Sequence, residues 1–183
     1  LRRDESGYDD RPKGPQRRRL IEAHAAAQEF YAEQLATPDA IAARQFLDQR
    51  GFDQDAAGHF GVGFAPRDGD ALWRHLSGRK FTSEEVVAAG LVAMGRSLYD
   101  RFRGRLLWPI RETNGDVIGF GARRLFDDDR VEAKYLNTPE SPIYKKSHVL
   151  YGIDLARREI ASLSQAVVVE GYTDVMACHL AGV

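Results

Sequence analysis

Two carboxylates near the end of the sequence have a spacing that suits metal chemistry. In residues 165–183, QAVVVEGYTDVMACHLAGV, four apolar residues lead directly into Glu170, and Asp174 follows about one helical turn later. The apolar run predicts a strand covered on both faces, and the residues after Gly171 predict a helix that ends at Gly182. Glu170 is then expected at the carboxyl end of a strand, where open α/β sheets bind ligands, and Asp174 in the first turn of the next helix.

Carboxylates placed in this way suit Mg²⁺, which takes one or two of them and keeps waters and substrate phosphates as further ligands. A simpler interpretation exists for each acid. Asp174 would complement the positive end of a helix, and Glu170 would end a strand in solvent. The residues alone leave both interpretations of Asp174 open. They favour a ligand role more strongly for Glu170, because no capping rule asks for an acid directly after a buried valine run.

The upstream segments predict the elements that must position these acids. Residues 1–19 lack apolar periodicity and contain the basic run RPKGPQRRR, which predicts a linker. Helical periodicity begins at Leu20. Further elements are expected as helices at residues 37–51, 82–90, 149–163 and 173–182, and as a short strand at 59–66. Asn114-Gly115 lies between two apolar runs within 103–125, which is a strong β-hairpin signal.

Composition narrows the class of protein. The hydrophobic content of 43% suits a packed core, and no run approaches the roughly 18 apolar residues of a membrane span. A single cysteine, Cys178, excludes a disulfide framework and a cysteine zinc cluster within these residues. The sequence begins at Leu1 without a secretory signal or an initiator methionine, so we expect a piece of a longer cytoplasmic protein.

The stretch from Arg101 to Lys146 is predicted to contact nucleic acid. It holds ten Lys or Arg residues against seven Asp or Glu residues, although the net charge of the whole chain is only −1. Several of the basic residues stand next to aromatic or amide side chains, a pattern that suits phosphate contacts combined with base stacking. For any single arginine, a solvated surface charge is the simpler interpretation. Trp73 and Trp108 are expected in the core, and Asp127–Asp129 in a loop that binds no metal.

The motif VVVEGYTDVMACHLAGV resembles the opening of the TOPRIM fold, in the form found in bacterial DnaG-type primases. Upstream, the blocks RFRGRLLWPIRETNGDVIGFGARRL, KYLNTPES and LYGIDLARR follow in the order and approximate spacing of that family, and FLDQRGFDQDAAGHFGVGFAP resembles an earlier block. The resemblance covers about residues 20–183. It implies a mixed α+β fold, with a helical and β-hairpin subdomain of the primase catalytic core over 20–164. The first strand, turn and helix of a TOPRIM α/β sheet would follow over 165–183.

The resemblance also implies a function. Primases of this type synthesise short RNA primers from ribonucleoside triphosphates on single-stranded DNA, by metal-dependent nucleotidyl transfer during replication. Glu170 and Asp174 would be catalytic, and Glu170 would bind Mg²⁺ or Mn²⁺, with the remaining ligands in a DxD motif beyond Val183. The positions that match the family's nucleic-acid- and nucleotide-binding residues are Arg50, Arg101, Arg103, Arg123, Lys134, Asn137 and Lys146.

Further expectations concern segments outside this sequence. A zinc ribbon, which would hold Zn²⁺, is expected before Leu1, and a domain that binds the replicative helicase is expected after the catalytic core. The chain by itself is expected to be inactive, and the whole protein to work in the cytoplasm at the nucleoid without a membrane contact. Two alternatives stay open: a fragment of a TOPRIM nuclease or topoisomerase, against which the KYLNTPES block speaks, and a non-catalytic module that binds single-stranded nucleic acid.

Overall fold

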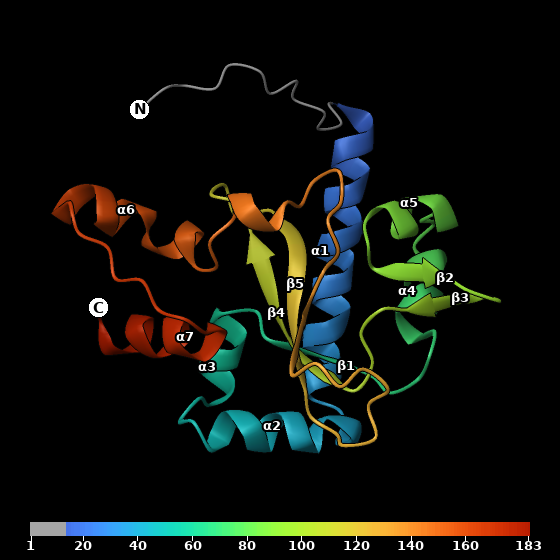
Figure 1. Ribbon diagram of the computed structural model, residues 1–183, viewed down its shortest axis with the longest axis horizontal. Coiled ribbons are helices and arrows are strands. Elements are labelled where there is room, and N and C mark those ends of the chain that lie inside the picture. The colour runs from blue at the N-terminus through green and yellow to red at the C-terminus, as the bar shows by residue number, and fades with distance from the viewer. Residues whose placement is uncertain (1–13) are drawn as a thin grey trace.

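A four-stranded antiparallel sheet lies at the centre of the chain, with helices on both of its faces (Figure 1). The computed structural model describes residues 14–183, and the predicted linker residues 1–13 lie outside this range. The strands are ordered β1 (Gly63–Ala65), β4 (Arg105–Arg111), β5 (Val117–Arg124) and β6 (Tyr135–Asn137). A separate two-stranded sheet pairs β2 (Val92–Met94) with β3 (Leu98–Asp100).

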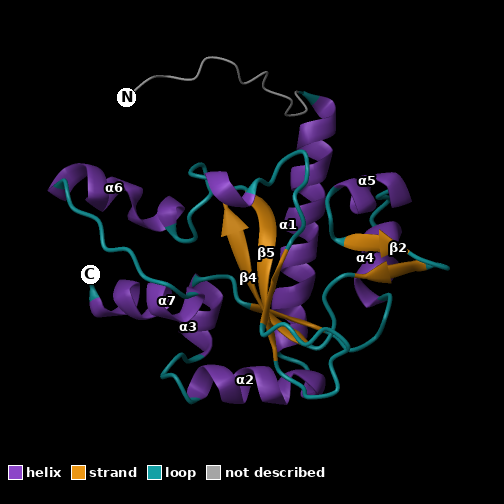
Figure 2. Ribbon diagram, in the orientation of Figure 1, coloured by secondary structure: helices purple, strands orange, loops and turns teal. Residues whose placement is uncertain are grey.

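Helices and loops make up the rest of the described chain (Figure 2). They are α1 (Pro15–Leu35), α2 (Ile41–Asp48), α3 (Gln54–His59), α4 (Ala71–Gly78), α5 (Ser83–Ala88), α6 (Ile153–Leu163) and α7 (Tyr172–Ala181), with 3₁₀ turns at Pro38–Ala40 and Lys146–His148. This mixed α+β architecture confirms the predicted fold class.

Alternating residues of the sheet build two hydrophobic cores. Leu107 and Phe120 belong to the core that contains α1, α4 and α5, whereas Phe64, Leu106 and Trp108 belong to the core that contains α2 and α3. This alternation follows from the two-residue period of a strand. Trp108 is completely buried, which confirms its prediction as a core residue.

Local sequence signals explain the main turns. The predicted hairpin is confirmed, because β4 and β5 pair around Asn114-Gly115, where Gly115 has a φ of 95° that favours glycine. Helix α5 begins with the predicted capping box: Thr82 Oγ1 accepts from the Glu85 amide, and the Glu85 carboxylate accepts from the Thr82 amide.

Two sequence-based predictions are wrong, one on the start of the first helix and one on the segment before Glu170. Helix α1 begins at Pro15 and not at Leu20, so residues 15–19, predicted as linker, are helical. The basic run is held to the domain by ion pairs from Arg17 to Glu112 at 2.5 Å and from Arg19 to Glu85 at 2.8 Å. Proline at the first helical position is compatible with this earlier start.

The predicted strand before Glu170 is also absent. No strand is assigned to residues 165–170, and the side chains of Val167 and Val168 are 58% and 82% exposed. A strand is held by hydrogen bonds to a neighbouring strand, and none of the described strands pairs with this segment. The apolar run therefore has a composition suited to a buried strand, but it forms none because no described strand pairs with it.

Helix α7 nevertheless packs firmly against the sheet. Met176 is completely buried, and the indole N–H of Trp108 donates to its sulfur at 3.1 Å. His179 lies 5.9 Å from the ring of Phe60 at the end of α3, in agreement with the neighbouring positions of α3 and α7 in Figure 1.

The loop after β5 is organised by a buried arginine. Arg105 is 1% exposed, pairs with Asp129 at 2.7 Å, and donates to the carbonyls of Val131 and Ala133. All parts of its guanidinium are thereby used within the fold. The acidic segment Asp127–Asp129 is a loop, as predicted.

No helix within residues 14–183 has the length and apolar character to cross a membrane.

Asp100 connects β3 to the start of α4. Its carboxylate is 2% exposed and accepts from the amides of Leu72 and Trp73 at 2.7 and 3.0 Å. Burial raises the pKa of Asp100 to about 6, although these two N–H donors act in the opposite direction. The folded chain therefore binds this proton more tightly than the unfolded chain, and the contribution of Asp100 to stability falls as the pH rises through about 4 to 6.

We predict that Asp100→Asn reduces this pH dependence, because the amide keeps one accepting oxygen and does not titrate. Between pH 4 and pH 7, the original protein should lose about 2 kcal/mol more unfolding free energy than the variant. Urea unfolding at both pH values measures this difference. An equal or smaller loss in the original protein would contradict the assignment.

Candidate nucleic-acid and metal site

The two predicted catalytic acids lie at the start of α7. Asp174 is in the first turn, as expected, and its Oδ2 accepts from the amide of Gly171 at 3.0 Å. Glu170 is exposed in the preceding turn. Asp174 therefore has a capping role in this structure, whereas Glu170 has no side-chain hydrogen bond or ion pair within residues 14–183.

The donor set fits a magnesium site only in part. Carboxylate oxygens are the right ligands for Mg²⁺ or Mn²⁺, and Mg²⁺ takes one or two of them from protein. Within residues 14–183, however, no group of three or more His, Cys, Asp or Glu side chains is placed to hold a metal ion. Glu170, exposed and unpaired there, contributes a single carboxylate.

A pair of arginines forms the most distinctive basic feature. The guanidinium carbon of Arg50 lies 3.6 Å from the centre of the Phe46 ring, and that of Arg123 lies 4.1 Å from the same centre. Arg50 follows α2, whereas Arg123 comes from β5. Phe46 is 8% exposed, so a buried ring holds two cations of like charge close together by cation–π contact.

Neither arginine of this pair has a carboxylate partner within the described chain. Arg123 Nε is buried without a hydrogen-bond acceptor. Burial, together with the charge of Arg50, lowers the pKa of Arg123 from its usual value. Burial and the neighbouring charge of Arg50 both make the positive charge of Arg123 costly. An anion next to this guanidinium would offset that cost and would therefore be bound favourably.

Strand β6 brings two more of the relevant residues, Tyr135 and Asn137, to the face of the sheet that carries Arg123. In register, Tyr135 is opposite Arg123, and Asn137 is opposite Gly121. The guanidinium of Arg123 lies 5.9 Å from the Tyr135 ring centre. Tyr135 is exposed, which leaves an aromatic ring available beside Arg123. Lys134, directly before β6, is also exposed, and its side chain has no contact with the arginine pair among the described interactions.

Asn137 belongs to a row that continues across the sheet. Trp108, Gly121 and Asn137 are direct partners on β4, β5 and β6, and Tyr172 of α7 contacts all three. Its ring stacks on Trp108 with centres 5.2 Å apart and an angle of 8°, and its hydroxyl donates to Asn137 Oδ1 at 2.8 Å. The row joins the basic strands to the helix that follows Glu170.

The remaining predicted binding residues have no contact with this cluster among the described interactions. Arg101 is exposed after β3, and the guanidinium of Arg103 lies 5.7 Å from the ring of Tyr99 on that strand. Lys146 is exposed in a 3₁₀ turn, where its backbone amide donates to Glu140. The structure therefore brings Arg50 and Arg123 together on Phe46 and places Asn137 on the strand that pairs with that of Arg123.

Sequence reasoning did not identify Phe46 or Tyr172 as part of the site. Phe46 lies on the apolar face of α2, so the sequence pattern predicts only an ordinary core residue there. Tyr172 stood within the EGYTDV motif, and the glycines of GFG, residues 119–121, were a signal for close packing against a strand. Arg105 was counted among the basic residues of the hairpin, but its guanidinium donates to Asp129, Val131 and Ala133 in the loop after β5.

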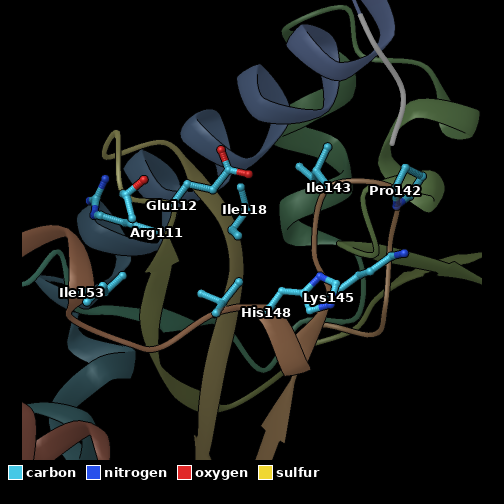
Figure 3. Close-up of a pocket in the computed structure, with 10 residues that line it drawn as sticks. Arg111, Glu112, Ile118, Pro142, Ile143, Lys145, His148 and Ile153 are labelled. Carbon is cyan, nitrogen blue, oxygen red and sulfur yellow. The ribbon is translucent and has the colours of Figure 1, made fainter. Parts of the chain in front are cut away.

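A cavity in the described chain lies elsewhere. It has a volume of about 300 Å³ and is located between the β4–β5 hairpin and the segment around residues 142–153 (Figure 3). Ile118, Ile143 and Ile153 form apolar parts of its wall, and Arg111, Lys145 and His148 contribute basic groups. None of the predicted site residues lines it.

The family profile described as "DNA primase catalytic core, N-terminal domain" matches residues 30–157. The DNA primase of Streptomyces coelicolor is 59% identical over 185 residues, which cover 100% of this chain and 29% of that protein. The chain therefore spans less than a third of the length of this curated relative.

Solved structures show the same relationship. The RNA polymerase domain of Mycobacterium tuberculosis primase DnaG superposes with a TM-score of 0.90 at 60% identity, over 91% of this chain and 54% of that one. The same domain in complex with a double-stranded DNA oligomer that has a 6-nucleotide overhang gives a TM-score of 0.90 at 60% identity, over 91% and 52% of the two chains. The motif-based resemblance is thereby confirmed, and the chain belongs to the family of bacterial DnaG-type DNA primases.

Proposed function

We propose that the whole protein is a DNA-directed RNA polymerase that makes short RNA primers on single-stranded DNA. This chain would supply a surface for the template and one acid of the metal site. The observation that carries the proposal is the pair Arg50 and Arg123 on Phe46, two guanidiniums without a carboxylate partner among the described residues. The complex of the M. tuberculosis relative with a DNA oligomer supports nucleic acid as the ligand.

The arrangement suits a strand held by its phosphates. Arg50 and Arg123 offer planar donors that match phosphate oxygens, and Lys134 adds a mobile cation. The exposed ring of Tyr135 lies beside Arg123, where a base can stack without being read by sequence. Arg101, Arg103 and Lys146 are proposed to extend this surface along the template and toward the nucleotide.

The proposed reaction is nucleotidyl transfer. A 3′-hydroxyl oxygen attacks the α-phosphorus of a ribonucleoside triphosphate, a new P–O bond forms, and the bond to the β-phosphate oxygen breaks with release of pyrophosphate. The hydroxyl proton passes to a base, for which Glu170 is our candidate. The protein contributes mainly by positioning the reactants and neutralising charge.

Glu170 is proposed to bind the catalytic Mg²⁺ or Mn²⁺, with Asp174 as a second acid of the same turn. When bound, the metal ion supplies positive charge next to the attacking and leaving oxygens. We propose that residues 165–183 open the TOPRIM part of the protein and that residues 20–164 form the subdomain before it. Further acidic ligands in a DxD motif, a zinc ribbon, the helicase contact and a place at the nucleoid belong to the same proposal.

The alternative of a TOPRIM nuclease or topoisomerase has no support in the family match, which covers residues 30–157 upstream of the TOPRIM motif. A non-catalytic binding module would retain the basic surface but would not require Glu170. The next experiment separates that module from a primase.

We predict that Glu170→Gln in the whole protein lowers primer synthesis by at least about a hundredfold, because the protein then lacks one metal-binding carboxylate. Binding of single-stranded DNA should remain unchanged. A priming assay with Mg²⁺, ribonucleotides and a single-stranded template measures the first quantity, and fluorescence anisotropy of a labelled oligonucleotide measures the second. Glu159→Gln, an exposed acid on α6, is the matched control, and full priming by Glu170→Gln would exclude the metal role.

Asp174→Asn tests the second acid separately. The amide oxygen can still accept from the Gly171 amide, so the start of α7 is preserved. A loss of priming comparable to that of Glu170→Gln is expected if Asp174 contributes its charge to the metal site. Priming at the original rate would restrict Asp174 to the capping role.

We predict that Arg50→Gln and Arg123→Gln each weaken single-stranded DNA binding and reduce its salt dependence. In a plot of log K against log salt, the slope should become shallower by about 0.7 for each phosphate that the variant no longer neutralises. Arg18→Gln, an exposed position paired with Glu22 on α1, should leave the slope unchanged. If all three variants have the slope of the original protein, the arginine pair does not belong to the template surface.

A further inference from the structure

Tyr172 occupies a position that only a glycine below it permits. Its ring lies over the centre of the row formed by Trp108, Gly121 and Asn137. A Cβ built on Gly121 would lie 2.1 Å from both Cζ and Oη of Tyr172, which is far inside the distance of real contacts. The second glycine of GFG therefore provides the space that the aromatic ring fills.

The neighbours of Tyr172 fix its direction. Stacking on Trp108 sets the plane of the ring, and Tyr151 contacts it edge-on with ring centres 4.8 Å apart. Burial raises the pKa of Tyr172, so the hydroxyl keeps its proton and acts as a donor to Asn137 Oδ1 at 2.8 Å. The ring therefore carries a donor held at one defined point above β6.

This hydrogen bond determines what Asn137 can offer to a ligand. A side-chain amide has one accepting oxygen and one donating NH₂ group. The oxygen is engaged by Tyr172, and Nδ2 has no acceptor within the described chain. Asn137 is only partly buried, so its NH₂ group is free to donate to an oxygen such as that of a phosphate.

We propose that Tyr172 is a positioning residue for template binding. It orients the Asn137 amide with its donor group toward the nucleic acid, and it ties β6 to the turn that carries Glu170. This inference rests on the proposed function, and it adds Asn137, one of the positions that match the family's binding residues, to the template surface. A purely structural role, in which Tyr172 only fastens α7 to the sheet, makes a different prediction: Tyr172→Phe would lower Tm and leave the affinity for the template unchanged.

The experiment uses the whole protein with Tyr172→Phe, Asn137→Ala and the double variant. Phenylalanine keeps the stacking on Trp108 and the fit over Gly121 but cannot donate to Asn137. Tyr151→Phe is the matched control, because it touches the same ring and its hydroxyl makes no hydrogen bond within residues 14–183. Anisotropy with a labelled single-stranded oligonucleotide gives the affinity, priming assays give KM for template and kcat, and thermal unfolding gives Tm.

We expect Tyr172→Phe to weaken template binding about three- to tenfold, the effect of removing one hydrogen bond. KM should rise with little change in kcat, and Tm should stay close to that of the original protein. The double variant should bind no more weakly than Asn137→Ala, because the two residues act as one unit. Tyr151→Phe should bind like the original protein.

Two results would overturn the inference. The first is a double variant whose loss equals the sum of the single losses, and the second is Tyr172→Phe with unchanged affinity. If either occurs while Arg50→Gln and Arg123→Gln weaken binding as predicted, the proposed function stands and only the role of Tyr172 fails. If the arginine variants also bind normally, the proposed template surface itself is wrong.

Discussion

The packing of Tyr172 over Gly121 is the constraint on which the arrangement of the site depends. A side chain of any size at position 121 would fill the space of the ring. With glycine there, one aromatic side chain reaches both Trp108 in the core and Asn137 on β6. Helix α7 is thereby fixed to the sheet at its first residue, Tyr172, which follows Glu170 by two residues.

The state of each arginine decides which of them can serve a ligand. Arg105 and Arg124 are direct partners across the hairpin, and both donate to carbonyls of the loop after β5. Their guanidinium groups therefore stabilise that loop. Arg50 and Arg123 have an aromatic ring in place of an acid, and each donates to only one backbone carbonyl, that of Phe46 for Arg50 and that of Arg124 for Arg123. Basic residues that looked equivalent in the sequence therefore differ in how many of their N–H donors the fold uses.

Much of the fold could be predicted from local signals. The Asn114-Gly115 hairpin and the Thr82 capping box depend on interactions between residues close in sequence, and both were correct. The strand before Glu170 was wrong, because strand formation depends on a partner that sequence periodicity does not reveal. The early start of α1 was missed for a similar reason, since the ion pair from Arg17 to Glu112 joins distant parts of the chain.

The candidate site was predictable to a smaller extent. Motif resemblance identified Arg50, Arg123 and Asn137, but no pattern indicated that Phe46 would bring the two arginines together. The hydrogen bond from Tyr172 likewise depends on the register of β4, β5 and β6, which places a glycine between a tryptophan and an asparagine. Such relations between strands are set by tertiary structure and have no signature in a single segment.

The position of Mn²⁺ in crystals of the whole protein with a ribonucleoside triphosphate tests the central claim most directly. The account predicts that the anomalous signal of the ion lies at coordination distance, about 2 Å, from the Glu170 carboxylate, with Tyr172 still seated over Gly121. An ion bound to phosphate oxygens far from Glu170, or a helix α7 displaced from the sheet in that complex, would contradict it.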